Sequence, residues 1–269
     1  MKDPEPPRDG RGPMLIGSSL KMYFTHARTV AWAEEVARIV AAHPAAAAGV
    51  TPFVIPQYPS IPACVEIGAP AGLAVGAQDL ATHDAGPYTG EVSGAVLAEL
   101  GCRFVEVGHA ERRRLYGESD DVVAAKVFAA QRNGLVPLVC VGEAARGEPD
   151  AAVVECVRQI ESALSAARAA GLHGEIVIAY EPLWAIGAPE PAGAPYIDAV
   201  CRALRAHLEQ APEHARLIYG GSAGPGLLTE IADAVDGIFL GRFAHDPRAF
   251  GAVLDEAAGI LAARQKESR

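Results

Sequence analysis

Ile176-Val-Ile-Ala-Tyr180 is a run of apolar residues that leads directly into Glu181 and Pro182. The run is apolar throughout rather than alternating, and strands of this kind are typical of a parallel sheet that is covered on its outer face. Seven further runs share this character: Met14–Gly17, Val50–Ile55, Leu73–Ala77, Phe104–Val107, Val136–Val141, Leu217–Tyr219 and Gly237–Leu240. The sequence therefore predicts eight parallel strands.

Segments with helical spacing lie between or after these runs. Apolar residues recur at intervals of three and four over 32–40, 153–164, 197–208 and 250–261. Eight units of strand and helix favour a closed (β/α)8 barrel, and an open doubly wound sheet is the alternative, because it uses the same alternation. No obvious domain linker interrupts the units, so we expect one α/β barrel domain over residues 14–269.

Composition narrows the class of protein. Half of the 269 residues are hydrophobic and 21% are charged, which is enough apolar material for one large core. The net charge of −10 argues against nucleic acid as a partner.

The five cysteines form no C-x-x-C pair, so neither a disulfide framework nor a zinc site is indicated, and a reducing cytoplasm fits best. Residues 1–13 predict a loose tail rather than a secretory signal, and no later run is suited to span a membrane.

Polar residues follow the carboxyl ends of the predicted strands. In a parallel barrel these ends share one rim, and active sites are built there. The residues concerned are Lys21, Gln78, His109, Glu111, Glu143, Glu181, Gly220-Gly221-Ser222 and Gly241-Arg242. We therefore expect a single site that is assembled from distant parts of the sequence.

Glu181 is the candidate base of this site. It lies where a buried strand passes into a loop, and burial would raise its pKa, as a base that removes a proton next to a carbonyl requires. The alternative is a strand-end carboxylate paired with Arg or Lys, which is the more common finding for an isolated Glu.

His109 and Lys21 are the candidate partners of this base. A neutral imidazole can donate a hydrogen bond to a carbonyl oxygen, and helix amides next to His109 would disfavour its cation. Lys21 could stabilise a negatively charged oxygen and attract a phosphate. A Schiff base with the substrate, or a simple ion pair with Glu111, are the alternatives for this lysine.

Two glycine-containing loops follow the last two strands. Gly220-Gly221-Ser222 and Gly241 offer backbone N–H groups that no side chain obstructs, and a phosphate site at this place recurs in barrels. Neither is a Walker loop, because no Gly-Lys-Ser/Thr follows. Glycine pairs alone usually mark turns, so these loops indicate a phosphate site only together with the other polar residues of the rim.

Four segments match one known family. Ala179-Tyr-Glu-Pro-Leu-Trp-Ala-Ile-Gly187 resembles the catalytic-glutamate and lid signature of the triosephosphate isomerase family. Val107-Gly-His-Ala-Glu-Arg-Arg113 resembles the histidine segment of this family, and Tyr219-Gly-Gly-Ser222 resembles its phosphate loop. Gly17-Ser-Ser-Leu-Lys-Met22 resembles its lysine segment. The resemblance covers nearly the whole chain from Met14, and it implies a TIM barrel.

The resemblance also implies a reaction, a cofactor-free isomerisation of a small phosphorylated sugar. Glu181 would move a proton between adjacent carbons through a cis-enediol(ate), while His109 and Lys21 would stabilise the oxygens. Triosephosphate isomerase is itself the standard worked example of a carboxylate base beside a neutral histidine. A lid that begins at Pro182 would close over the substrate. Gly187, Ser222, Gly241 and Arg242 would offer backbone amides to the phosphate.

An interface is implied as well. Tyr88-Thr89 resembles the loop that inserts into a partner subunit in this family. The resemblance therefore implies a homodimer.

Several positions depart from the family pattern. Ser19 stands where the family has Asn, Ala110 where it has Ser, and Arg242 where the last loop has its second phosphate glycine. The lid tip reads Ala188-Pro-Glu-Pro191 in place of Thr-Gly-Lys-Thr. Drift without a new function would explain these changes, and so would a substrate other than a triose phosphate.

The substrate is therefore open between two sugars. Ser19 and Ala110 are smaller than the family's residues, which opens space beside the reacting carbons. L-Erythrulose 1-phosphate is dihydroxyacetone phosphate with one more CH2OH on the carbon that loses its proton, and the Gly-x-Ser-x-Lys-Met opening resembles branches assigned to such tetrulose phosphates. A one-carbon difference is worth about 1 to 3 kcal/mol in specificity, so activity on both sugars is expected.

Two further classes of function stay open at this point. Prolines in the lid tip could stiffen the segment that must move, which would suit a catalytically weak phosphosugar-binding or structural barrel. A Schiff-base aldolase that uses Lys21 is the other class.

Overall fold

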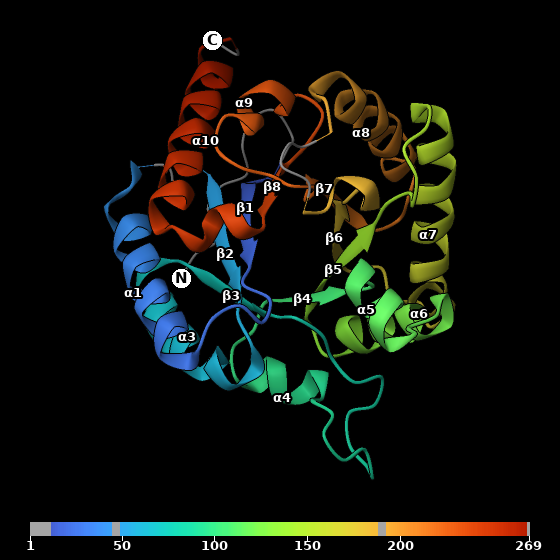
Figure 1. The fold of residues 1–269 in the computed structure, drawn as a ribbon. Coiled ribbons are helices and arrows are strands. Elements are labelled where there is room, and N and C mark those ends of the chain that lie inside the picture. The colour runs from blue at the N-terminus through green and yellow to red at the C-terminus, as the bar shows by residue number, and fades with distance from the viewer. Residues whose placement is uncertain (1–11, 45–48, 188–191, 268–269) are drawn as a thin grey trace.

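The described strands close into a barrel. The computed structural model describes residues 12–44, 49–187 and 192–267, so most of the predicted tail (1–11) and the lid tip (188–191) lie outside the described residues. Each strand pairs in parallel with the next, and β8 pairs with β1 (Figure 1). The predicted closed (β/α)8 barrel is confirmed, and the open sheet is excluded. The strands are β1 (Met14–Ser19), β2 (Val50–Ile55), β3 (Ala74–Ala77), β4 (Phe104–Val107), β5 (Val136–Val141), β6 (Glu175–Tyr180), β7 (His214–Tyr219) and β8 (Gly237–Leu240).

Helices form a ring around the strands (Figure 1). The α-helices are α1 (His26–Ala42), α3 (Ile61–Gly68), α4 (Gly94–Glu99), α5 (Ala110–Tyr116), α6 (Asp120–Arg132), α7 (Pro149–Ala169), α8 (Ala194–Leu208), α9 (Leu227–Ile231) and α10 (Pro247–Glu267). The short 3-10 helices are η1 (Tyr58–Ser60), η2 (Ala69–Ala71), η3 (Leu183–Ala185) and η4 (Arg242–His245). The four segments with helical spacing correspond to α1, α7, α8 and α10.

Helix α1 shows how the pattern becomes structure. The Thr25 side chain caps its start by accepting a hydrogen bond from the Arg28 N–H. The apolar residues at helical spacing, Trp32, Val36 and Val40, are buried. They pack in the core between the sheet and the helices, so their burial holds α1 against the barrel.

Strand β7 begins earlier than predicted, at His214 rather than at Leu217. Its first residues pair with the first residues of β6 through the backbone, which needs no apolar side chain. The Arg216 guanidinium lies 3.7 Å from the Asp236 carboxylate, which precedes β8. Polar side chains are therefore tolerated at this amino end of the strand, away from the rim.

The barrel interior is filled by side chains. The Phe53 ring lies 4.7 Å from that of Phe104 and 5.7 Å from that of Phe239, between ring centroids. Gly17 on β1 makes room for this stack, because a Cβ at Gly17 would collide with the Phe53 ring. Burying each such ring stabilises the fold by about 1.5 to 3 kcal/mol. Because the interior is packed, a ligand site can form only at an end of the barrel.

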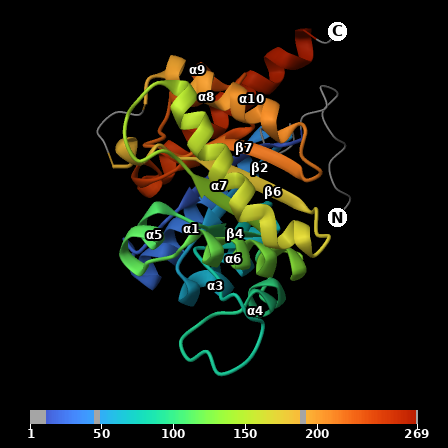
Figure 2. The ribbon, with the colours of Figure 1, turned by 90° about the vertical axis from the view of Figure 1, so that its right-hand side faces the viewer.

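A long loop, residues 78–93, projects from the body of the barrel between β3 and α4 (Figures 1 and 2). It carries Tyr88, whose side chain is exposed. In the part of the chain that the structure describes, no helix has both the length and the apolar character needed to cross a bilayer.

Candidate active site

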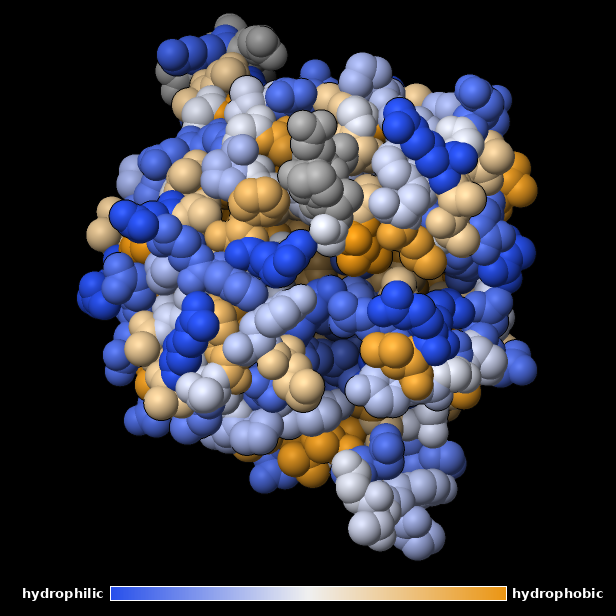
Figure 3. Space-filling view, viewed as in Figure 1, coloured by the Kyte–Doolittle hydropathy of each residue, from blue (hydrophilic) through white to orange (hydrophobic). Residues whose placement is uncertain are grey.

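A cavity of about 700 Å³ opens at the carboxyl ends of the strands. Figure 3 shows this face of the molecule, where hydrophilic side chains gather around a central hollow. The structure brings all eight predicted site residues to its wall: Ser19, Lys21, His109, Glu181, Gly187, Ser222, Gly241 and Arg242. One pocket therefore unites residues that are up to 223 positions apart in the sequence, from Ser19 to Arg242.

Glu181 lies at the end of β6 with its side chain buried. Its backbone N–H donates to the Val141 carbonyl, which extends the pairing of β6 with β5 by one residue. Burial, and then the negative charge of Glu106, raise the pKa of Glu181 to about 8. Among the described residues its ion-pair contact is with His109, at 3.5 Å, and no Arg or Lys pairs with it. The alternative of a simple Arg or Lys ion pair is therefore not observed.

His109 precedes α5 and caps its start. Its Nδ1 accepts a hydrogen bond from the Glu111 N–H at 3.1 Å, so Nδ1 carries no proton and the neutral ring is protonated at Nε2. Burial, and then the positive charge of Lys21, lower the pKa of His109 to about 4. The ring is therefore neutral near pH 7, and Nε2 lies 3.5 Å from Glu181 Oε2.

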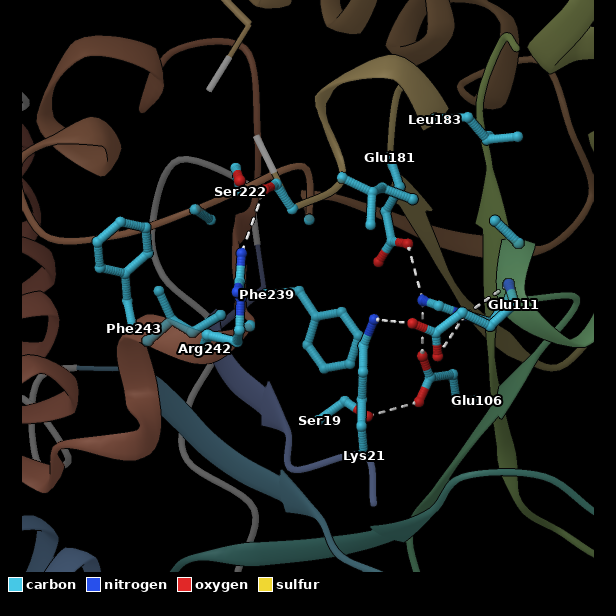
Figure 4. Close-up of a pocket in the computed structure, with 18 of the residues that line it drawn as sticks. Ser19, Lys21, Glu106, Glu111, Glu181, Leu183, Ser222, Phe239, Arg242 and Phe243 are labelled. Atoms are coloured by element: carbon cyan, nitrogen blue, oxygen red, sulfur yellow. Dashed lines mark hydrogen bonds and ion pairs between the residues drawn. The ribbon is translucent and has the colours of Figure 1, made fainter. Parts of the chain in front are cut away.

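Lys21 follows β1 in a strained backbone conformation, with φ at +47°. The Gln78 side chain donates to the Lys21 carbonyl at 2.9 Å, and this contact helps to hold the strained residue. Its Nζ donates to Glu111 Oε1 at 2.9 Å (Figure 4), so the predicted ion pair is present. Burial acts to lower the pKa of Lys21, but the contact with Glu111 and the charge of Glu181 outweigh it, so the pKa is raised. The amine is therefore a stable cation, which does not suit a Schiff-base nucleophile.

The β7 and β8 loops form the opposite wall of the pocket. Ser222 adopts a left-handed conformation, with φ at +50°. Arg242 Nη2 donates to the Gly187 carbonyl at 3.1 Å, which joins the last loop to the base of the lid segment. Arg242 also adds positive charge where the family pattern has glycine. In a protein with a net charge of −10, such local donors are what an anionic ligand requires.

Glu143 belongs to the predicted rim, yet it does not line the cavity. Its buried carboxylate accepts hydrogen bonds from Trp184 Nε1 at 2.7 Å and from the hydroxyls of Tyr180 and Tyr196 at 3.1 and 3.0 Å. Trp184 belongs to η3, at the base of the lid segment. Glu143 therefore anchors this segment to the barrel, and its side chain is directed away from the pocket.

Glu106 lines the cavity and was not among the predicted site residues. It lies inside β4, where Phe104 points into the barrel and Val105 and Val107 point toward the helices. The strand period of two therefore directs Glu106 inward, above Phe104. Its carboxylate accepts a hydrogen bond from Ser19 Oγ at 2.9 Å (Figure 4). The available signal was one charged residue within an otherwise apolar strand.

The described residues contain no group of three or more His, Cys, Asp or Glu side chains that could hold a metal ion. The site brings together proton donors and acceptors, with a buried carboxylate of raised pKa next to a neutral imidazole. A barrel with this pairing at the carboxyl ends of its strands defines an acid–base enzyme.

Comparison with known proteins identifies the family. The family model described as triosephosphate isomerase matches residues 14–257, and the chain belongs to this family. It is 51% identical to the L-erythrulose-1-phosphate isomerase of Pectobacterium atrosepticum over 247 residues, which cover 91% of this chain and 95% of that one. It is 39% identical to the triosephosphate isomerase of Rhodococcus jostii over 260 residues, with 91% and 97% covered.

A solved structure agrees with these relatives. The triosephosphate isomerase of Bartonella henselae superimposes with a TM-score of 0.75 at 28% identity, and the match covers 91% of this chain and 99% of that one. The chain is thus an isomerase of this family, as its resemblance implied, rather than an aldolase or a non-catalytic barrel.

Proposed function

We propose that this isomerase converts L-erythrulose 1-phosphate into D-erythrulose 4-phosphate by moving the carbonyl from C2 to C3. The observation that carries the proposal is the 51% identity to a protein named L-erythrulose-1-phosphate isomerase, against 39% to the triosephosphate isomerase of Rhodococcus jostii. A triose phosphate, one carbon shorter, is the second candidate substrate, because it fits the same catalytic groups.

The pocket supports a substrate with an added carbon. Ser19 and Ala110 both line the cavity, and both are smaller than the Asn and Ser of the family pattern. The Ser19 hydroxyl donates a hydrogen bond to Glu106, which also lines the cavity. A pocket that is larger by one carbon changes specificity by about 1 to 3 kcal/mol, or roughly 10- to 200-fold.

The proposed mechanism uses three side chains. Glu181 takes the proton from C3, and the electrons of that bond form the enediolate as the C2 carbonyl gains charge. His109 donates its Nε2 proton to the C2 oxygen and recovers a proton from the C3 hydroxyl, while the Lys21 cation stabilises both oxygens. Glu181 then returns its proton to C2. Atoms and charge balance without a metal or a cofactor.

The phosphate contacts are part of the same proposal. Gly187, Ser222 and Gly241 offer backbone donors, and Arg242 offers a guanidinium, all on the β7 and β8 side of the pocket. Binding energy from the phosphate would hold the reacting carbons against Glu181 and His109.

The proposal includes a homodimer and a cytoplasmic location. The projecting loop 78–93 with the exposed Tyr88 supports an interface, and five free, buried cysteines fit a reducing compartment. Light scattering of the purified protein at micromolar concentration should give twice the mass of one chain. The mass of a single chain would overturn the dimer.

The substrate is tested by comparing kcat/KM for L-erythrulose 1-phosphate and for dihydroxyacetone phosphate. We expect the tetrulose phosphate to be turned over with the higher kcat/KM. A kcat/KM at least tenfold higher for dihydroxyacetone phosphate would reject the proposal. The Glu181→Gln variant is the control, and it should lack activity on both sugars.

A further inference from the structure

Glu106 is a buried carboxylate that takes no part in the proton transfers proposed for Glu181 and His109. It is 4% exposed, and it points into the barrel interior, where it lines the cavity. A carboxylate in such a place lowers stability unless polar partners satisfy it, so an apolar residue would be the expected occupant of this inward position.

The two carboxylate oxygens of Glu106 differ in their partners. Oε2 accepts the hydrogen bond from Ser19 Oγ at 2.9 Å. Oε1 accepts a long hydrogen bond from the Cys140 thiol, with Sγ at 3.9 Å, and lies 4.0 Å from His109 Nε2. Oε1 therefore has unused capacity to accept a hydrogen bond, beside the imidazole nitrogen that faces the reacting carbons.

Glu106 lies across the pocket from the phosphate-binding wall. In the closed barrel β4 is opposite β8, and the proposed phosphate contacts follow β7 and β8. Figure 4 shows Arg242 and Ser222 on one side of the pocket and Glu106 on the other. A substrate with its phosphate at the β8 side therefore directs its far end toward Glu106.

We propose that Glu106 is a specificity-determining residue that accepts a hydrogen bond from the terminal hydroxymethyl group of the four-carbon sugar phosphate. This inference rests on the proposed function and deepens it. In L-erythrulose 1-phosphate the hydroxymethyl group is attached to C3, at the end opposite the phosphate. In D-erythrulose 4-phosphate the same group keeps its place, so one acceptor serves both substrate and product.

Ser19 and Glu106 act together in this proposal. The small Ser19 opens the space that the added carbon needs, and its hydroxyl orients the carboxylate that binds the added oxygen. A triose phosphate has no group to place there and would leave the buried Oε1 with only the weak, long hydrogen bond from the Cys140 thiol. A site built to bind a hydroxyl discriminates more strongly than a pocket that is merely larger.

The test measures kcat/KM at about pH 8.5, above the raised pKa of Glu106, for L-erythrulose 1-phosphate and for dihydroxyacetone phosphate in wild type, Glu106→Val and Glu106→Gln. We expect the ratio of tetrulose to triose activity to fall at least tenfold in Glu106→Val, because valine cannot accept a hydrogen bond. In Glu106→Gln we expect a fall of about threefold to tenfold, because a neutral amide oxygen is a weaker acceptor than a carboxylate. Glu209→Gln, which removes an exposed carboxylate at the end of α8, is the matched control and should keep the wild-type ratio.

A ratio within twofold of wild type in both Glu106 variants would overturn the assignment. If Glu106→Val does not fold, as judged by circular dichroism, the near-isosteric Glu106→Gln decides the question alone. A loss of packing would lower both activities together and leave the ratio unchanged, so the ratio separates recognition from structure. A wild type that prefers the triose phosphate would reject the proposed function, whereas an unchanged ratio in the variants rejects only the role of Glu106.

Discussion

Gly220 lies so close to the proposed base that a single methyl group there would displace it. A Cβ at this position would lie 2.5 Å from Glu181 Oε1 and 2.8 Å from its Cγ. Non-bonded heavy atoms make favourable contacts at about 3.5 Å, so Gly220→Ala requires the Glu181 carboxylate to move by about 1 Å. A displacement of about 1 Å at a reacting group can lower the rate about 100-fold.

We therefore expect kcat for Gly220→Ala to fall about 100-fold with L-erythrulose 1-phosphate, with little change in KM. The change leaves the predicted phosphate contacts in place, so the loss concerns the chemical step rather than binding. Gly259→Ala is the matched control: this glycine is exposed on α10, and a Cβ there would meet no atom within 4 Å. The control should keep the wild-type kcat and gain about 1 kcal/mol in the free energy of unfolding, as alanine does in a helix.

The assay is steady-state kinetics of both variants at equal concentration, with melting temperatures measured in parallel. Overpacking by one methyl group can destabilise the fold by about 1 to 3 kcal/mol, so activities are compared well below the melting temperature. A kcat for Gly220→Ala within threefold of wild type would refute the reasoning, because it would mean that the position of Glu181 does not control the rate.

Three further predictions concern charge. If Glu181 is the base, kcat/KM should rise with pH and level off above about pH 8, where Glu181 is ionised; a profile that is flat from pH 6 to 9 would contradict this. Burial raises the pKa of Glu106 to about 7 from an ordinary 4.5, so ionisation costs the folded state about 3 kcal/mol as pH rises from 4.5 to beyond 7. Glu106→Gln avoids this cost, so the melting temperature of the variant should rise relative to that of wild type as the pH is raised from 5 to 8. A difference in melting temperature that stays constant over this range would contradict the burial argument. Lys126 Nζ contacts the buried Asp79 and Glu118 carboxylates, each at 2.6 Å, and the Arg112 guanidinium also pairs with both. Lys126→Met removes one of these cations and leaves Arg112, so chemical denaturation should show a loss of about 1.5 to 3 kcal/mol, and a loss below about 0.5 kcal/mol would contradict it.

Much of the fold could be predicted from the sequence because strands buried on both faces leave unbroken apolar runs. The run that ends in Tyr180 becomes β6 with one added residue at its start, Glu175. The early start of β7 could not be predicted in this way, because backbone pairing at the amino end of the barrel tolerates polar side chains such as His214.

The sequence predicts which residues lie near the site, but it does not predict which way each side chain points. The rule that polar residues after the carboxyl ends of strands form the site predicted Glu181, His109 and Lys21, and these residues share the pocket. The same rule also selected Glu143, whose direction is set by aromatic residues from other elements of the chain. It missed Glu106, because this residue lies within a strand rather than after it. Only the alternation of side chains along β4 shows that Glu106 points into the barrel.

The exchange of substrate hydrogen with solvent tests the central claim most directly, since proton abstraction by Glu181 must precede every later step. Wild type and Glu181→Gln are incubated with L-erythrulose 1-phosphate in deuterium oxide, and the C3 hydrogen is followed by proton magnetic resonance. We predict rapid loss of this signal with wild type and none above background with Glu181→Gln at the same protein concentration. Exchange at a near-normal rate in Glu181→Gln would contradict the account.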